Sequence, residues 1–175
     1  MIPAPSPATE EPIRMTKHAL VRWDGGMHLV GEASTGDRLE MDDEAGGHGF
    51  RPSELLMVSL GGCTAMDVVS ILRKKQQTIA SYEVDVTGET RPTHPKAYTD
   101  VVVEHRVEGE PLDPEAVRRA IELSATKYCT VTGVMATGIA RIVHRYVVHN
   151  ASGEHRGEVI TTGPRGVNVA GLEQG

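Results

Sequence analysis

Two cysteines, Cys63 and Cys129, are the residues of this 175-residue chain whose chemistry stands out, and they lie 66 positions apart. In a redox pair, one thiolate attacks the O–O bond of a peroxide and becomes a sulfenic acid. The second thiol condenses with that acid to a disulfide, which an external thiol then reduces. Free cysteine is also among the most buried residue types, so two buried side chains without a redox role remain an alternative, as does one structural disulfide.

Other kinds of site are disfavoured by the composition. Two cysteines are too few for a four-cysteine zinc site or an iron–sulfur cluster. The eight histidines are scattered, without an HExxH motif or a close Cys/His cluster, so we expect neither a metal site nor a cofactor. A net charge of −6 provides no broad basic surface for phosphates, which disfavours a nucleic-acid partner.

Cys63 falls inside a long apolar segment that is predicted to be a helix. The segment begins near Pro52-Ser53-Glu54, where a proline and an acidic residue are typical of a first helical turn, and it runs to about Lys75. Apolar residues cover nearly its whole circumference, which indicates burial on several sides. Each glycine inside a helix costs about 1 kcal/mol relative to alanine, so Gly61-Gly62 indicates a compensating close approach of another backbone.

Short strands and a second helix surround this segment. A hairpin turn is predicted at Asp24-Gly25-Gly26, and the later strands show alternating apolar residues. The second helix begins with Asp113 as its N-cap and Pro114 at its first position, and it ends near Cys129. The predicted strands cover residues 20–23, 27–30, 37–41, 82–87, 100–107 and about 139–148. This order of elements predicts an α+β fold.

The chain has about the length of one domain, with a tail at each end. Residues 1–14 are rich in proline and alanine and are predicted to be a disordered tail, residues 15–148 form the domain, and the Gly-rich residues 149–175 are predicted to be a flexible C-terminal tail. The N-terminus lacks the pattern of a secretory signal, so we expect a cytoplasmic protein that does not bind a membrane. The first helix is more apolar than one small sheet can cover, which indicates a homodimer.

Two segments resemble the motifs of one protein family. The segment from Arg51 to Leu72, with Gly61-Gly62-Cys63-Thr64 at its centre, resembles the signature helix of the OsmC/Ohr family. The segment Ala125-Thr-Lys-Tyr-Cys-Thr-Val131 resembles the second cysteine motif of that family. The order and spacing of the elements match from about Lys17 to Val148. The resemblance implies an OsmC-like fold, in which two central helices are wrapped by antiparallel sheets in an intertwined homodimer.

The same resemblance implies a function. Better-known members of the family are thiol-dependent peroxidases that reduce organic hydroperoxides in defence against oxidative stress. Cys63 would be the peroxidatic cysteine and Cys129 the resolving one, the substrate would be a small apolar hydroperoxide, and the reductant an external thiol or a lipoylated protein. The alternative is a non-catalytic or weakly reactive OsmC-like protein that binds a ligand or carries a thiol.

The residues that activate the peroxidatic cysteine in this family do not all have counterparts here. A family glutamate lies ten residues before that cysteine, where this chain has Ser53. Glu54 lies nine residues before it, about 180° away around a helix, whereas ten residues correspond to about 80°. Arg38 and Arg51 are the candidates for the family arginine that stabilises the thiolate.

Asp67 is a second departure, because it lies four residues after Cys63 and therefore on the same helix face. Its negative charge would disfavour the thiolate that a peroxidatic cysteine needs. Three explanations stay open: an arginine bridges Asp67 and Cys63, Cys63 is less reactive than in the peroxidases, or Asp67 pairs with a cation of a partner chain.

Overall fold

The computed structural model describes residues 16–43, 47–139, 141–164 and 166–169. It divides into two compact units, Met1–Pro52 and Ser53–Gly175, each of which we describe by itself. The predicted disordered tail, residues 1–14, lies outside the described residues.

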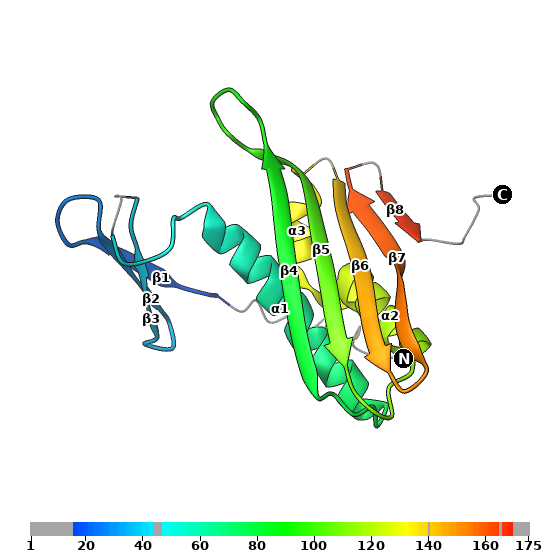
Figure 1. The fold of residues 1–175 in the computed structure, drawn as a ribbon. Coiled ribbons are helices and arrows are strands. Elements are labelled where there is room, and N and C mark those ends of the chain that lie inside the picture. The colour runs from blue at the N-terminus through cyan, green and yellow to red at the C-terminus, as the bar shows by residue number, and fades with distance from the viewer. Residues whose placement is uncertain (1–15, 44–46, 140, 165, 170–175) are drawn as a thin grey trace, which may run out of the picture. The chain divides into compact units, whose positions relative to one another are not determined.

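The first unit contains a three-stranded antiparallel sheet (Figure 1). Its strands are β1 (Ala19–Trp23), β2 (Leu29–Ala33) and β3 (Arg38–Met41), in that spatial order. The predicted hairpin between the first two strands is confirmed. Gly25 and Gly26 in its turn have φ angles of 102° and 52°, a left-handed conformation that glycine adopts without steric cost.

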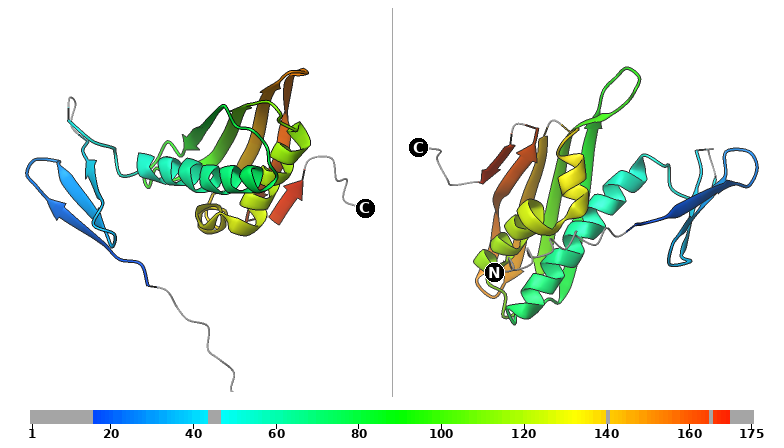
Figure 2. Two further views of the ribbon diagram at one scale, coloured as in Figure 1. Left: turned by 90° about the horizontal axis from the view of Figure 1, so that it is seen from below. Right: turned by 180° about the vertical axis from the view of Figure 1, so that it is seen from behind.

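The second unit has two layers, a five-stranded sheet and a layer of helices on one of its faces (Figures 1 and 2). The strands, in spatial order, are β4 (Ser81–Thr90), β5 (Tyr98–Glu108), β6 (Arg141–Asn150), β7 (Gly153–Gly163) and β8 (Gly166–Val169). The helices are α1 (Glu54–Lys74), α2 (Pro114–Leu123), the π-helical turn η1 (Ser124–Tyr128) and α3 (Thr130–Met135). The predicted α+β class is therefore confirmed.

Only one neighbouring pair in the five-stranded sheet, β5 with β6, is parallel. Parallel neighbours cannot be joined by a tight turn and need a long crossover. The chain makes that crossover with α2, η1 and α3, which carry it over the sheet from the end of β5 to the start of β6. The helix layer is thus a direct consequence of the strand order.

The prediction of a flexible C-terminal tail over residues 149–175 is wrong for the part that the structure describes. Residues 153–163 and 166–169 form β7 and β8, and β7 pairs with β6 from Ile142↔Thr162 to Asn150↔Gly153. The first half of β7 is largely exposed and polar, and only its second half enters the core. Without a run of alternating apolar residues, the segment gave no strand signal.

The helix α1 has one face on the sheet and another that no described residue covers. Its buried residues are Leu60, Gly61, Thr64, Val68 and Leu72. A Cβ atom on Gly61 would lie 3.1 Å from Cγ2 of Val86 in β4, whereas one on Gly62 would meet no described atom within 4 Å. Gly61 is therefore approached closely by side chains of β4 and not by the backbone that the sequence led us to expect, and among the described residues α1 is not buried on several sides.

Apolar side chains stand on the uncovered face of α1. Leu56 is 48% exposed, Val58 50% and Met66 77%. By length and composition alone α1 could cross a membrane, but the core helix of a soluble protein passes the same test. One side of α1 packs against β4 and α2.

A buried row of rings crosses β4, β5 and β6 on the face covered by the helices. The Tyr82 hydroxyl lies 2.6 Å from Nδ1 of His105, and the rings of His105 and His144 stack with centroids 6.0 Å apart. Both histidines are fully buried, and neither ring nitrogen of His144 has a partner among the described residues. Burial lowers the pKa of His144 to about 4. Burial also lowers the pKa of His105 well below its ordinary value, and the neighbouring His144 ring lowers it further. Both rings are therefore neutral at pH 7.

The buried neutral histidines predict an acid-sensitive fold. Because His144 titrates near 6.5 in the unfolded chain and at about 4 in the folded one, the unfolded chain binds more protons between these values. We expect the free energy of unfolding to be highest above pH 6.5 and to fall toward pH 4, with roughly 3 kcal/mol attributable to His144. Urea titrations across this range should show the fall, and His144→Leu should remove its share.

The exposed His149 provides the matched control for this experiment. The variant His149→Gln should keep the pH dependence of the unmodified protein. If His144→Leu also kept the whole of it, the assignment of a buried neutral ring to His144 would be refuted.

Candidate active site

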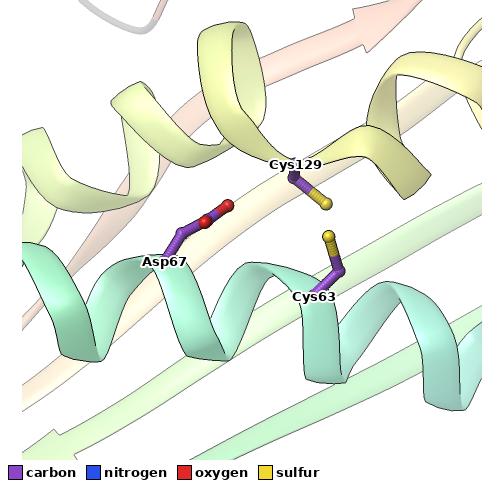
Figure 3. A group of neighbouring side chains, drawn as sticks. All are labelled: Cys63, Asp67 and Cys129. Carbon is purple, nitrogen blue, oxygen red and sulfur yellow. The ribbon is translucent and has the colours of Figure 1, made fainter. Parts of the chain in front are cut away.

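The helix α1 places Cys63 and Asp67 one turn apart on the same face, as their spacing predicts. That face lies opposite η1 and the start of α3 (Figure 3). Cys63 is half-buried and packs against the cluster of buried side chains that includes Leu60, Val103 and Ile142.

Cys129 is positioned by a break in the second helix that the sequence pattern did not reveal. The predicted continuous helix ends at Leu123, and the next turn is a π-helix, in which the Cys129 N–H donates to Ser124 O at 2.9 Å. Cys129 leaves the helical conformation, with φ −69° and ψ 103°, and becomes the N-cap of α3. Its Sγ accepts the Thr132 N–H at 3.3 Å. Single π-turns within α-helices are frequent at functional sites.

The two cysteines and Asp67 meet between α1 and η1. The two Sγ atoms and a carboxylate oxygen of Asp67 all lie within 4.8 Å of one another (Figure 3). Both cysteines are free thiols. Cys129 is only 5% exposed, whereas Cys63 is partly exposed.

The surroundings of Cys129 favour its protonated form. Burial raises the pKa of the Cys129 thiol, its hydrogen bond with Cys63 raises it further, and the Thr132 N–H acts in the opposite direction. A raised pKa means that Cys129 retains its proton at pH values where an ordinary thiol begins to lose it. Of the two sulfur atoms, the buried one is therefore held as a thiol.

Among the described residues, a hydroxyl group rather than a cation holds Asp67 in place. The Ser124 hydroxyl donates to Oδ2 of Asp67 at 2.8 Å, and its oxygen lies 3.0 Å from Oγ1 of Thr64 in a second hydrogen bond. Ser124 and Thr64 are fully buried. Within the described ranges, no ion pair involves Asp67, so an arginine that bridges Asp67 and Cys63 is not found there.

The other candidate residues lie elsewhere along the chain, Glu54 in the second unit and the two arginines in the first. Glu54 begins α1, and nine residues of helix place it about 13.5 Å along the axis from Cys63, beyond direct contact. Arg38 and Arg51 belong to the first unit. Arg38 donates to Oε2 of Glu32 at 3.2 Å, and Arg51 lies 3.1 Å from Oδ1 of Asp43.

Sequence analysis missed Ser124 as a residue that supports the site. It lies on the apolar stripe of the second helix, at a position where a serine must be buried with its hydroxyl paired. A polar residue on such a stripe, one position before the second cysteine motif, was the available signal. Nothing in the sequence signals the π-turn itself.

Two hollows in the surface border α1, and neither is lined by Cys63 or Cys129. One, of about 390 Å³, is mainly apolar and includes Gly62, the neighbour of Cys63. The other, of about 460 Å³, lies beside Asp67 and contains two lysines. The apolar hollow is lined by Met57, Val58, Gly61, Gly62, Ala65, Val84 and Val86. The second hollow is lined by Asp67, Ser70, Ile71, Lys74, Lys75, Leu123 and Tyr128.

The fold and the site define a class of α+β protein. In it, a cysteine on a long helix faces a second cysteine in the crossover between two parallel strands. A family model described as OsmC-like protein matches residues 45–143, and the chain belongs to this family. Protein YhfA of Escherichia coli strain K12 is 38% identical over 130 residues, which are 74% of this chain and 96% of YhfA.

Solved structures of other proteins share the fold. A hypothetical protein from Aquifex aeolicus VF5 superimposes with a TM-score of 0.70 at 26% identity, over 77% of this chain and 97% of that one. An organic hydroperoxide resistance protein from Elizabethkingia anophelis superimposes with a TM-score of 0.56 at 14% identity, over 80% of this chain and 99% of that one. At that identity the second likeness establishes the fold alone.

The position of Asp67 predicts that its charge restrains the reactivity of Cys63. Two unit charges about 5 Å apart interact by roughly 1 kcal/mol even in bulk water. We therefore expect Asp67→Asn to increase the alkylation rate of Cys63 by iodoacetamide by a factor of about four or more at neutral pH. Peptide mapping by mass spectrometry measures this rate for Cys63 separately from Cys129.

Asp85→Asn, on the exposed face of β4, is the control that removes one negative charge away from the thiols. It should leave the alkylation rate unchanged. An unchanged or lower rate in Asp67→Asn would mean that a cation outside the described contacts compensates the Asp67 charge.

Proposed function

We propose that this protein is a thiol-dependent peroxidase that reduces organic hydroperoxides with Cys63 and Cys129. The observation that carries the proposal is the pairing of two free thiols, one half-buried and one buried, within 4.8 Å of each other. Such a pair can pass from dithiol to disulfide with a small movement of the side chains.

The accessible sulfur is the one suited to meet the peroxide. The Cys63 thiolate attacks the outer oxygen of the hydroperoxide, the O–O bond breaks, and the alkoxide takes a proton and leaves as an alcohol. Cys63 is then a sulfenic acid.

The buried sulfur completes the cycle. The Cys129 sulfur attacks Cys63, the S–O bond breaks, and water leaves as the disulfide forms. Because Cys129 retains its proton, this step needs a base, and the Asp67 carboxylate lies close enough to accept the proton and pass it to the departing hydroxide. An external dithiol, such as a lipoylated protein, then restores both thiols by exchange.

A specific observation favours a second candidate, a weakly reactive protein that binds a ligand or carries a thiol on the same fold. Asp67 has no ion pair within the described part of the chain, and Ser53 stands where the family peroxidases have glutamate. Both features lower the expected nucleophilicity of Cys63. The rate of peroxide reduction decides between the two candidates.

The peroxidase proposal predicts the products of single turnovers. Treatment of the reduced protein with one equivalent of tert-butyl hydroperoxide should produce a Cys63–Cys129 disulfide, detected by mass spectrometry. Cys63→Ser should lower peroxide consumption by about two orders of magnitude or more, because the nucleophile is lost. Cys129→Ser should stop after one turnover, with a sulfenic acid at Cys63 that dimedone traps.

Turnover that survives in Cys63→Ser would refute the assignment of this residue. If the reduced protein formed no disulfide and consumed peroxide no faster than glutathione does, the second candidate would replace the first.

We further propose that the protein is a homodimer whose copies meet through α1. The support is the exposed apolar pair of Val58 and Met66 on one side of α1, together with the open space at Gly62 between them, where a second helix could approach closely. Apolar helix faces of this kind in soluble proteins mark contacts between chains.

The dimer proposal predicts that a charge on this face separates the copies. Met66→Lys should shift the protein from dimer to monomer in sedimentation velocity, because a lysine head group would be buried without a partner. The control Thr87→Lys, on the exposed face of β4, should remain dimeric. A monomeric unmodified protein would contradict the proposal.

A further inference from the structure

We propose that the reduced protein binds a zinc ion through Cys63, Cys129 and Asp67. This inference does not depend on the peroxidase proposal, because it concerns the dithiol form in the absence of peroxide. It assigns a role to Asp67, whose negative charge opposes rather than assists the reactivity of a peroxidatic thiol.

The three side chains are a suitable ligand set for zinc. Zinc binds thiolate sulfur and carboxylate oxygen, and many of its reactive sites use three protein ligands and leave a fourth position for water or an incoming thiol. Tetrahedral zinc with Zn–S bonds of about 2.3 Å requires sulfur atoms about 3.8 Å apart. All three ligand atoms already lie within 4.8 Å of one another, so movements of about 1 Å or less bring them to binding distance.

The residues around the ligands also fit a metal site. Ligating carboxylates in metal sites are usually fixed by a hydrogen bond to one oxygen, and Ser124 provides that bond to Oδ2 of Asp67 at 2.8 Å. The Thr132 N–H, which donates to Sγ of Cys129 at 3.3 Å, stabilises a coordinating thiolate. Because Cys63 and Asp67 are only partly buried, an ion can enter from the side of α1.

Binding of zinc would protect the two thiols. A metal-bound sulfur has its lone pair engaged with the ion, and formation of a disulfide would require release of that ion. Zinc and peroxide would therefore compete for the same sulfur atoms, and zinc would inhibit any reaction that needs a free Cys63 thiolate.

The test uses the reduced full-length protein and added metal alone. Titration with Zn²⁺ in competition with a chromophoric chelator should show one ion per chain, and Co²⁺ should produce the near-ultraviolet charge-transfer absorption of cobalt–thiolate bonds. Cys63→Ser and Cys129→Ser should abolish that absorption and weaken zinc binding by about a hundredfold or more. Asp67→Asn and Ser124→Ala should each weaken it by roughly tenfold.

The cobalt signal separates this site from histidines on the surface, which bind metal without thiolate absorption. Asp85→Asn, which removes an exposed carboxylate of β4, should bind zinc as the unmodified protein does. Should Cys129→Ser fail to fold, the unmodified protein still gives an answer, because one equivalent of Zn²⁺ should slow alkylation of both cysteines together.

Three results would each overturn the inference. The first is the absence of cobalt–thiolate absorption at stoichiometric metal. The others are a zinc affinity that is the same in the cysteine variants as in the unmodified protein, and an alkylation rate that is the same with and without Zn²⁺. Peroxide consumption is measured separately on the metal-free protein. A protein that binds zinc and does not reduce peroxide would thus be distinguished from one that does the reverse.

Discussion

The packing of α1 against the π-turn before Cys129 is the contact on which the site depends. The hydroxyl of Ser124, which is fully buried, links Thr64 and Asp67 on α1 to the turn that follows α2. A buried hydrogen bond that loses its partner costs about 1–3 kcal/mol, so these groups tolerate little sliding of one helix along the other. Because Cys63 and Cys129 lie one turn further along the same contact, that restriction also fixes the distance between the two sulfur atoms.

The interior of the second unit is unusually polar near this contact. Two clusters of buried apolar side chains, one around Val68 and Ile121 and the other around Leu60 and Cys129, are accompanied by the ring row of Tyr82, His105 and His144. Burial raises the pKa of Tyr82, and the nearby charge of Asp67 raises it further. The electrostatic effect of Asp67 therefore reaches the ring row through Tyr82. Polar groups in such a core cost stability, and their arrangement restricts the helix layer to one position on the sheet.

Much of the fold could be predicted from local patterns, because α1, α2 and the first six strands carry strong periodicity or clear turn and cap residues. Asp113, for instance, caps α2 as expected and accepts the Glu115 N–H at 3.0 Å. The strand β7 could not be predicted from local patterns, because its first half is polar and its second half is recognisable only from the partner strand β6. At the site, the spacing of Cys63 and Asp67 predicted their shared face. Their meeting with Cys129 depends on a π-turn and on tertiary packing, which spacing along the chain does not encode.

The parallel pairing of β5 with β6 has a consequence for how the protein folds. A hairpin such as β4–β5 can close locally, but a parallel neighbour can join the sheet only after the whole crossover has been placed over its face. Cys129 lies within that crossover, and Cys63 lies on a helix that precedes both strands. The two sulfur atoms therefore come within reach of each other only when the crossover has packed against α1. Formation of a disulfide between them would therefore require that this packing is in place.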